Sequence, residues 1–292
     1  MSIPKIAAVN DLSGFGRCSL TVALPVLSAM GLQVCPLPTA LLSNHTGFPR
    51  FTFDDRTDQL PADIDCWRQL GLRFDAVYTG FLGSEAQVDT VTAFLSEFTC
   101  PGGLKLVDPV MGDHGKPYAT FSPSFCRAMR RLIAAGDIIT PNLTEACLLT
   151  DEDYGALLRC PDEADFLARV YALGERTVAL GSARVVITGV SRQGEAVVRN
   201  VIVESGSCQH TVHPMVPVRY AGTGDLFASV LCGCLMRGTP LQDAVEYAAN
   251  FVSRTVADTA DSGNPPLHGV EFEPLLPTLF PQSDTVLREE RL

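Results

Sequence analysis

Short apolar runs alternate with longer amphipathic stretches from the first residues to about residue 190. The short runs, bounded by turn-forming residues, predict buried strands, and the longer stretches predict helices. The predicted strands are Ile6–Val9, Val34–Leu37, Ala76–Thr79, Leu104–Val107, Asp137–Ile139 and Val185–Thr188. The predicted helices are Ser19–Met30, Glu85–Phe98, Ser124–Ala135, Leu143–Leu149 and Glu163–Leu173. This alternation is typical of a mostly parallel sheet with helices on both faces, an α/β fold.

The pattern changes in the last third of the chain. Residues Glu195–Val203 and Gln209–Val216 alternate between polar and apolar, which predicts an antiparallel pair outside the main sheet or at its edge. Two predicted helices follow, Gly224–Met236 and Leu241–Thr259. Residues 51–60 are rich in aspartate and predict a surface flap, and residues 282–292 form a polar tail. Without an internal repeat or a long linker, residues 1–292 are expected to form a single domain.

Composition narrows the class of protein. The 292 residues are 46% hydrophobic, which is enough for a full core, and the net charge of −11 argues against nucleic acid and anionic membranes as partners. No apolar run approaches the roughly 20 residues that span a bilayer, and the N-terminus lacks a signal-peptide layout. The ten cysteines include no CxxC pair. We therefore expect a cytoplasmic protein with reduced cysteines.

A glycine-rich turn, Ala221–Asp225, carries the clearest chemistry. Gly222 and Gly224 allow the backbone to approach a phosphate, and the helix predicted to follow points free N–H groups at it. Asp225 then has the position of a general base that takes a proton from a substrate hydroxyl, while the N–H groups of Gly222, Thr223 and Gly224 stabilise a transferring phosphoryl group. The alternative is an aspartate that only stabilises the helix dipole. Neither a Walker A loop nor a dinucleotide fingerprint fits, because the lysine and the third glycine are missing.

Two motifs together resemble a known superfamily. Ala221–Leu226 resembles the anion-hole and base motif of the ribokinase superfamily, and Pro141–Glu145 resembles its second motif, Asn-x-x-Glu. The resemblance implies a ribokinase-like three-layer fold and an ATP-dependent kinase. It also implies Mg²⁺ bound with ATP, a monovalent cation such as K⁺, and a homodimer. The residues it assigns are Asn142, Thr188 and Asp113 to ATP, and Asp108 and Glu145 to the metal. Residues 112–118 are expected to form a mobile cover over the phosphates.

Two further segments narrow the substrate. Ser43–Gly47 and Asp108–Asp113 resemble the pyridoxal kinase branch of that superfamily, and Gly80–Ser84 supports it. The resemblance covers roughly Lys5 to Asp258 and implies phosphorylation of the 5′-hydroxymethyl group of a vitamin B6 compound. The residues expected around the pyridine ring are Asn44, His45, Thr46 and Phe81. Taken alone, His45 is more often a loop histidine bonded to the backbone, and Phe81 a core residue.

Asp11 departs from the branch, where serine is common at the matching position. We hypothesise that Asp11 pairs with the pyridine nitrogen or bonds the ring hydroxyl. The alternative is an aspartate that accepts hydrogen bonds from nearby amides where a helix begins. Two rival functions remain: a hydroxymethylpyrimidine kinase, which shares the fold and the glycine-rich turn, and a non-catalytic B6-binding protein.

Overall fold

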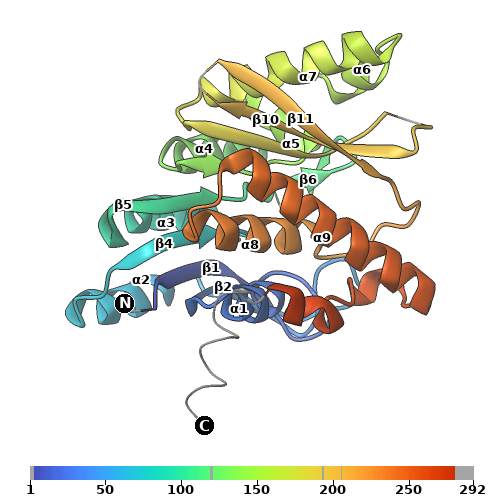
Figure 1. The fold of residues 1–292 in the computed structure, drawn as a ribbon. Coiled ribbons are helices and arrows are strands. Elements are labelled where there is room, and N and C mark those ends of the chain that lie inside the picture. The colour runs from blue at the N-terminus through green and yellow to red at the C-terminus, as the bar shows by residue number, and fades with distance from the viewer. Residues whose placement is uncertain (1–2, 119–120, 193, 205, 280–292) are drawn as a thin grey trace.

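A mostly parallel sheet forms the centre of the molecule (Figure 1). The computed structural model describes residues 3–118, 121–192, 194–204 and 206–279, and these contain a nine-stranded sheet in the order β11-β10-β9-β8-β5-β4-β1-β2-β3. Its strands are β1 (Lys5–Ser13), β2 (Gln33–Leu42), β3 (Phe53–Asp55), β4 (Phe74–Thr79), β5 (Thr99–Val107), β8 (Ile138–Ile139), β9 (Arg184–Val190), β10 (Val197–Glu204) and β11 (Ser207–Pro214).

The strand directions agree with the sequence pattern. The strands from β9 to β2 pair in parallel, whereas β10 and β11 add an antiparallel pair at one end and β3 pairs antiparallel with β2 at the other. The predicted parallel sheet and the predicted antiparallel pair at its edge are therefore confirmed. Because parallel strands end on the same side, the loops after β1, β4, β5, β8 and β9 meet along one edge.

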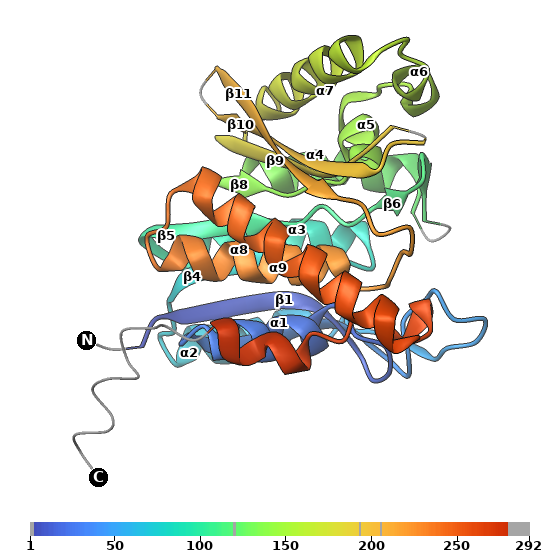
Figure 2. The ribbon, with the colours of Figure 1, turned by 45° about the vertical axis from the view of Figure 1, so that its right-hand side comes forward.

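Helices cover both faces of the sheet (Figure 2). One face packs against α1 (Leu20–Ala29), α8 (Thr223–Met236), α9 (Leu241–Ser262) and the short helix η2 (Glu273–Leu279). The other packs against α2 (Leu60–Gln69), α3 (Glu85–Phe98), α4 (Pro123–Ala134), α5 (Leu143–Thr150), α6 (Tyr154–Leu158) and α7 (Glu163–Val178). Neighbouring strand residues enter opposite cores, as Leu106 and Val107 do, because side chains alternate along a strand. Among the described helices, none is long and apolar enough to cross a membrane.

Several short elements were not predicted. Helix α2 buries only Leu60 and Ile64, so its apolar pattern is too sparse to stand out in the sequence. A small hairpin, β6 (Gly112–Asp113) and β7 (Lys116–Pro117), occupies the segment expected to cover the phosphates. The predicted surface flap, residues 51–60, contains the exposed strand β3. The predicted polar tail, residues 282–292, lies outside the described residues.

A buried glutamine ties this flap to the body of the domain. Gln87 on α3 is fully buried, and its Nε2 donates to the carbonyl oxygen of Thr39 at 2.9 Å. The same nitrogen lies 3.0 Å from Asp55 Oδ1 and 3.0 Å from Thr57 Oγ1. One amide thus joins the last strand of the sheet to the helical layer behind it.

We predict that Gln87→Ala lowers the free energy of unfolding by about 2 kcal/mol, because the buried carbonyl of Thr39 loses its side-chain donor. Urea denaturation measures the change. The matched control is Gln69→Ala, since Gln69 is exposed and its amide bonds Asp65 alone among the described residues; we expect a change within about 0.5 kcal/mol. Equal midpoints for the two variants would contradict the tie between flap and helix.

Candidate active site

The glycine-rich turn lies where α8 begins. Gly222 has a left-handed backbone, with φ of 78°, and a Cβ at this residue would lie 1.9 Å from the carbonyl oxygen of Arg17. Both the backbone conformation and the space therefore require glycine. The N–H groups of the first turn of α8 have no partner within the helix, so the turn offers donors to an anion.

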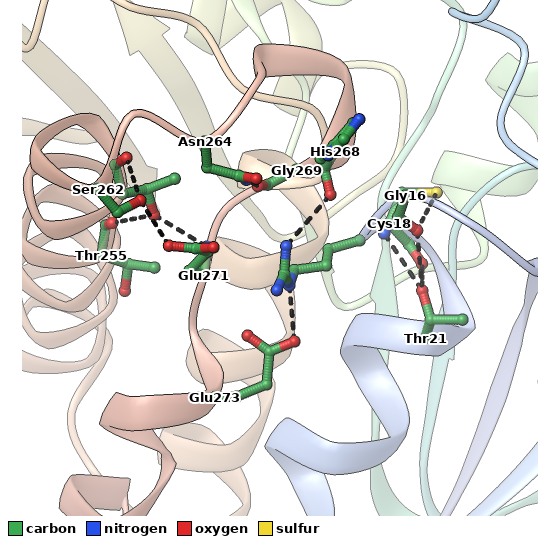
Figure 3. Close-up of polar contacts among 12 residues, drawn as sticks. Gly16, Cys18, Thr21, Thr255, Ser262, Asn264, His268, Gly269, Glu271 and Glu273 are labelled. Atoms are coloured by element: carbon green, nitrogen blue, oxygen red, sulfur yellow. Dashed lines mark hydrogen bonds and ion pairs between the residues drawn. The ribbon is translucent and has the colours of Figure 1, made fainter.

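Two distant segments hold this turn in place. Arg17 N donates to the carbonyl of His268 at 3.1 Å, and Ala221 N donates to the carbonyl of Pro266 at 3.2 Å. The Arg17 side chain bonds Glu273 Oε1 at 2.6 Å. Figure 3 shows His268, Gly269 and Glu273 lining this junction, across from Gly16 and Cys18 of the loop after β1. The loop after β1, the glycine-rich turn and the C-terminal segment thus form one packed unit.

Asp225 faces the end of β1 from the first turn of α8. Asn10 Nδ2 donates to Asp225 Oδ1 at 3.2 Å. Burial raises the pKa of Asp225 to about 6; the charge of Asp11 also raises it, while N–H groups of Ser19 and Asn10 oppose the rise. A carboxylate with a pKa slightly below neutrality is mostly ionised at pH 7 and is suited to accept a proton.

Asp11 is also buried, but its carboxylate is fully engaged. Ser19 Oγ donates to one oxygen at 2.5 Å and Ser13 Oγ to the other at 2.9 Å. Ser19 has a positive φ of 52°, which is unusual for a residue other than glycine. The bond from Ser19 to Asp11 holds this residue where its N–H faces Asp225. The partners of the Asp11 carboxylate are thus serine hydroxyls, and not the helix-start amides of the alternative to ring binding.

Asp108 and Glu145 are buried side by side with Asp225 near. The oxygens of Glu145 accept the N–H groups of Met111 at 3.0 Å and Asn142 at 2.8 Å, and Asn142 caps α5 in return. Burial raises the pKa of Glu145 to about 8. Burial also raises the pKa of Asp108 well above its usual value, with further contributions from the charges of Glu145 and Asp225.

This arrangement fits a magnesium ion that arrives with a nucleotide. The described residues contain no group of three or more His, Cys, Asp or Glu side chains that would bind a metal by themselves. Mg²⁺ is commonly bound through one or two carboxylates together with waters and substrate phosphates. Within the described part of the chain, the Asp108 carboxylate accepts no hydrogen bond, so it is available as a direct ligand, whereas both oxygens of Glu145 already accept N–H groups.

The residues assigned to ATP lie beside these carboxylates. Asn142 Nδ2 donates to the carbonyl of Gly112 on the hairpin at 2.9 Å, and Thr188 pairs with Asn142 in a parallel bridge. Asp113 is exposed and bonds the N–H of His114 at 2.8 Å. The hairpin therefore borders the site.

Two residues that the sequence did not suggest also lie on this border. Arg219, just before the glycine-rich turn, bonds His114 Nδ1 on the hairpin at 2.8 Å. Tyr118 is 44% exposed, and partial burial together with the charges of Glu145, Asp113, Asp108 and Asp225 raises the pKa of its phenol. No motif assigned a contact to either residue: Arg219 precedes the glycine-rich turn, and Tyr118 ends the segment 112–118 that was expected as a cover.

The residues expected around the pyridine ring are less closely gathered than the carboxylates. His45 uses both ring nitrogens, with Nε2 2.7 Å from the carbonyl oxygen of Leu267 and Nδ1 accepting the N–H of Gly47 at 3.2 Å. Asn44 Nδ2 donates to the carbonyl of Arg50 at 2.8 Å, and Thr46 is exposed. His45 thus resembles the loop histidine of the alternative interpretation.

Phe81 connects the ring-binding candidates to the base. Its N–H donates to Asn10 Oδ1 at 2.8 Å, and its ring lies 5.7 Å from that of Phe121 and 6.4 Å from that of Phe53. Its side chain is partly buried and packs against the hydrophobic core. Asn10 on β1, to which no motif assigned a role, joins Phe81 to Asp225.

The chain is similar to known kinases over most of its length. The family described as phosphomethylpyrimidine kinase matches residues 26–268. A candidate phosphomethylpyrimidine kinase from Bacteroides thetaiotaomicron VPI-5482, crystallised with pyridoxal, is 40% identical; the match covers 95% of this chain and 96% of that one, with a TM-score of 0.88. Pyridoxal kinase from Lactobacillus plantarum is 33% identical over 99% of both chains, with a TM-score of 0.86. A pyridoxine/pyridoxal/pyridoxamine kinase from Bordetella avium (strain 197N) is 30% identical over 88% of this chain and 86% of the relative.

We predict that Gly222→Ala destabilises the protein by at least about 2 kcal/mol more than Gly238→Ala does. Both glycines have a positive φ, of 78° and 80°, but a Cβ at Gly238 meets nothing within 4 Å. The difference between the two variants therefore isolates the clash with Arg17. Thermal and urea unfolding measure it, and similar losses of stability in both variants would show that the turn can move away from Arg17.

Proposed function

Because this chain belongs to the phosphomethylpyrimidine kinase family and matches pyridoxal kinases over nearly its whole length, we propose that it transfers the γ-phosphate of ATP to the 5′-hydroxymethyl group of pyridoxal, pyridoxine or pyridoxamine. The chain is a kinase with the ribokinase-like three-layer fold that its motifs predicted. The observation that carries the proposal is Asp225, a carboxylate with a pKa of about 6 beside free helix N–H groups and two buried carboxylates.

The proposed chemistry is a direct, in-line displacement. Asp225 accepts the proton of the 5′-hydroxyl as its oxygen forms a bond to the γ-phosphorus, and the bond from that phosphorus to the β-phosphate oxygen of ATP breaks to release ADP. The N–H groups of Gly222, Thr223 and Gly224 donate to the phosphoryl oxygens, whose charge they stabilise without reorganisation.

The two buried carboxylates, Asp108 and Glu145, are proposed to serve the binding of the metal ion. Asp108 would bind Mg²⁺ directly, and Glu145 would hold Asn142 and the hairpin in place around it. Mg²⁺ when bound neutralises phosphate charge. Asn142, Thr188 and Asp113 are proposed to contact the ATP phosphates from the ends of neighbouring strands. K⁺ is proposed as the monovalent cation on the resemblance alone.

The vitamer is proposed to lie between Phe81 and the loop after β2. Thr46 and Asn44 supply polar groups, and Phe81 supplies a ring face. Since both nitrogens of His45 are engaged, this histidine would contact the ring by its face. A cytoplasmic location is consistent with ten free cysteines, and a homodimer is proposed from the resemblance.

Hydroxymethylpyrimidine phosphorylation is the second candidate, because the matching family is described as phosphomethylpyrimidine kinase, which names a related pyrimidine. A binding protein without catalytic activity is the third candidate.

We predict ADP formation from Mg-ATP with at least one B6 vitamer, at a kcat/KM exceeding that for hydroxymethylpyrimidine. Asp225→Asn should lower kcat about 10²- to 10⁴-fold while ATP binding persists, because only the base is lost. Turnover of the pyrimidine alone would favour the second candidate, and turnover of none of these substrates the third.

The pH dependence of kcat/KM is expected to follow the ionisation of the Asp225 carboxyl group. Asp225 acts only when ionised, so kcat/KM for the vitamer should rise through a pKa of about 6 and level off above neutrality. Activity at pH 5 should be about tenfold below that at pH 7. Steady-state kinetics at saturating Mg-ATP measure this profile, and the residual activity of Asp225→Asn should lack the acid limb. A flat wild-type profile between these two pH values would exclude Asp225 as the base.

A further inference from the structure

We propose that Asn10 is a positioning residue that aims the Asp225 carboxylate at the substrate hydroxyl, an inference that rests on Asp225 being the base of the proposed reaction. Asn10 lies near the end of β1 and is 1% exposed, and its Nδ2 donates to Asp225 Oδ1 at 3.2 Å. The two residues are 215 positions apart in the chain, so this contact joins the first strand to the helix that carries the base.

The orientation of the Asn10 amide is determined by its surroundings. Its Oδ1 accepts two backbone N–H groups, from Asp11 at 2.9 Å and from Phe81 at 2.8 Å. Backbone N–H groups only donate, so the oxygen must face them and the nitrogen must face Asp225. An aspartate here would place a second acceptor against Asp225, and a leucine would leave both N–H groups without a partner.

The space around this amide is equally restricted. A Cβ at Gly80 would lie 2.3 Å from Nδ2 and 2.8 Å from Oδ1 of Asn10. The backbone of residue 80 therefore passes directly against the amide plane, and Gly80 N bonds the carbonyl of Val9 at 2.8 Å. With two donors, one acceptor and this backbone around it, the Asn10 side chain has one orientation. A base held this way pays little entropy to align with a hydroxyl.

Asn10 also affects the charge of the base. Its N–H stabilises the ionised form of Asp225 and so lowers the pKa, against the raising effects of burial and of Asp11. The ionisable groups that sense Asp225 from the surrounding elements are Asp11 on β1, Cys18 before α1, Tyr78 on β4, Asp108 after β5 and Tyr118 after the hairpin. Among the groups around the carboxylate, Asn10 is the side chain that donates a hydrogen bond to it.

The test compares Asn10→Ala and Asn10→Asp with the wild-type chain. Asn10→Asp keeps the acceptor for Asp11 and Phe81 and replaces the donor with a second carboxylate, so it changes the contact to Asp225 in a side chain of the same shape. We expect the acid limb of kcat/KM to move up by about one pH unit in Asn10→Ala, since loss of a donor to a carboxylate favours its protonated form, and to move up further in Asn10→Asp, where the added negative charge acts in the same direction. We expect kcat to fall about tenfold or more at neutral pH with KM for ATP unchanged. Folded variants with the wild-type limb and kcat would overturn the proposal.

Asp11→Asn is the matched control on the neighbouring residue. It removes a charge that raises the pKa of Asp225, so the acid limb should move down or stay in place. An upward shift in this variant too would mean that any change at the end of β1 loosens the site, which would overturn a specific role for Asn10. A raised KM for the vitamer without a shifted limb would instead support ring binding by Asp11.

A measurement that needs no turnover tests this inference separately from the proposed function. The carboxyl infrared band that Asp225→Asn abolishes can be titrated in the wild type and in Asn10→Ala. A titration shifted upward in Asn10→Ala would support the positioning contact even if no vitamer were phosphorylated, in which case only the proposed function fails. An unshifted titration in a folded, active protein would overturn the contact and leave the function intact.

Discussion

Residue 222 lies so close to the carbonyl oxygen of Arg17 that only glycine fits, and much of the site depends on this approach. It brings the N-terminus of α8 against the loop after β1, so that Asp225 reaches Asn10 and Ser19. The C-terminal segment holds the junction from outside through hydrogen bonds of Pro266 and His268. A side chain at residue 222 would separate two segments whose contact shapes both the glycine-rich turn and the surroundings of Asp225.

The second constraint is electrostatic. Burial raises the pKa of Asp108, Glu145 and Asp225, and the charges of Glu145 and Asp225 raise the pKa of Asp108 further. Hydrogen bonds from the N–H groups of Met111 and Asn142 offset the cost of burying the Glu145 carboxylate, and the amide of Asn10 does the same for Asp225. The Asp108 carboxylate has no hydrogen-bond donor among the described residues. A protein with a net charge of −11 thus gathers three carboxyl groups where, in the proposed reaction, a magnesium nucleotide would supply the balancing cation.

Much of the fold was predictable because its determinants are local. Each strand predicted from an apolar run lies in or overlaps a strand of the sheet, and α3 has the predicted bounds, Glu85–Phe98. The elements that escaped prediction, α2, α6 and β3, bury few side chains, so their patterns are weak. The hairpin within residues 112–118 pairs only two residues per strand, too few for any periodicity.

The sequence by itself determined the class of fold, the family and the two motifs, because periodicity and motif spacing depend on residues near one another in the chain. It could not determine whether Asp11 and His45 are free to touch a ring. Tertiary structure decided that both oxygens of Asp11 bond serines and that His45 bonds Leu267, 222 positions away. It also revealed the contacts of Asn10, whose proposed positioning role depends on Asp225 and Phe81, which reach it from other elements. Such contacts arise from the close approach of distant backbone segments, for which no local pattern exists.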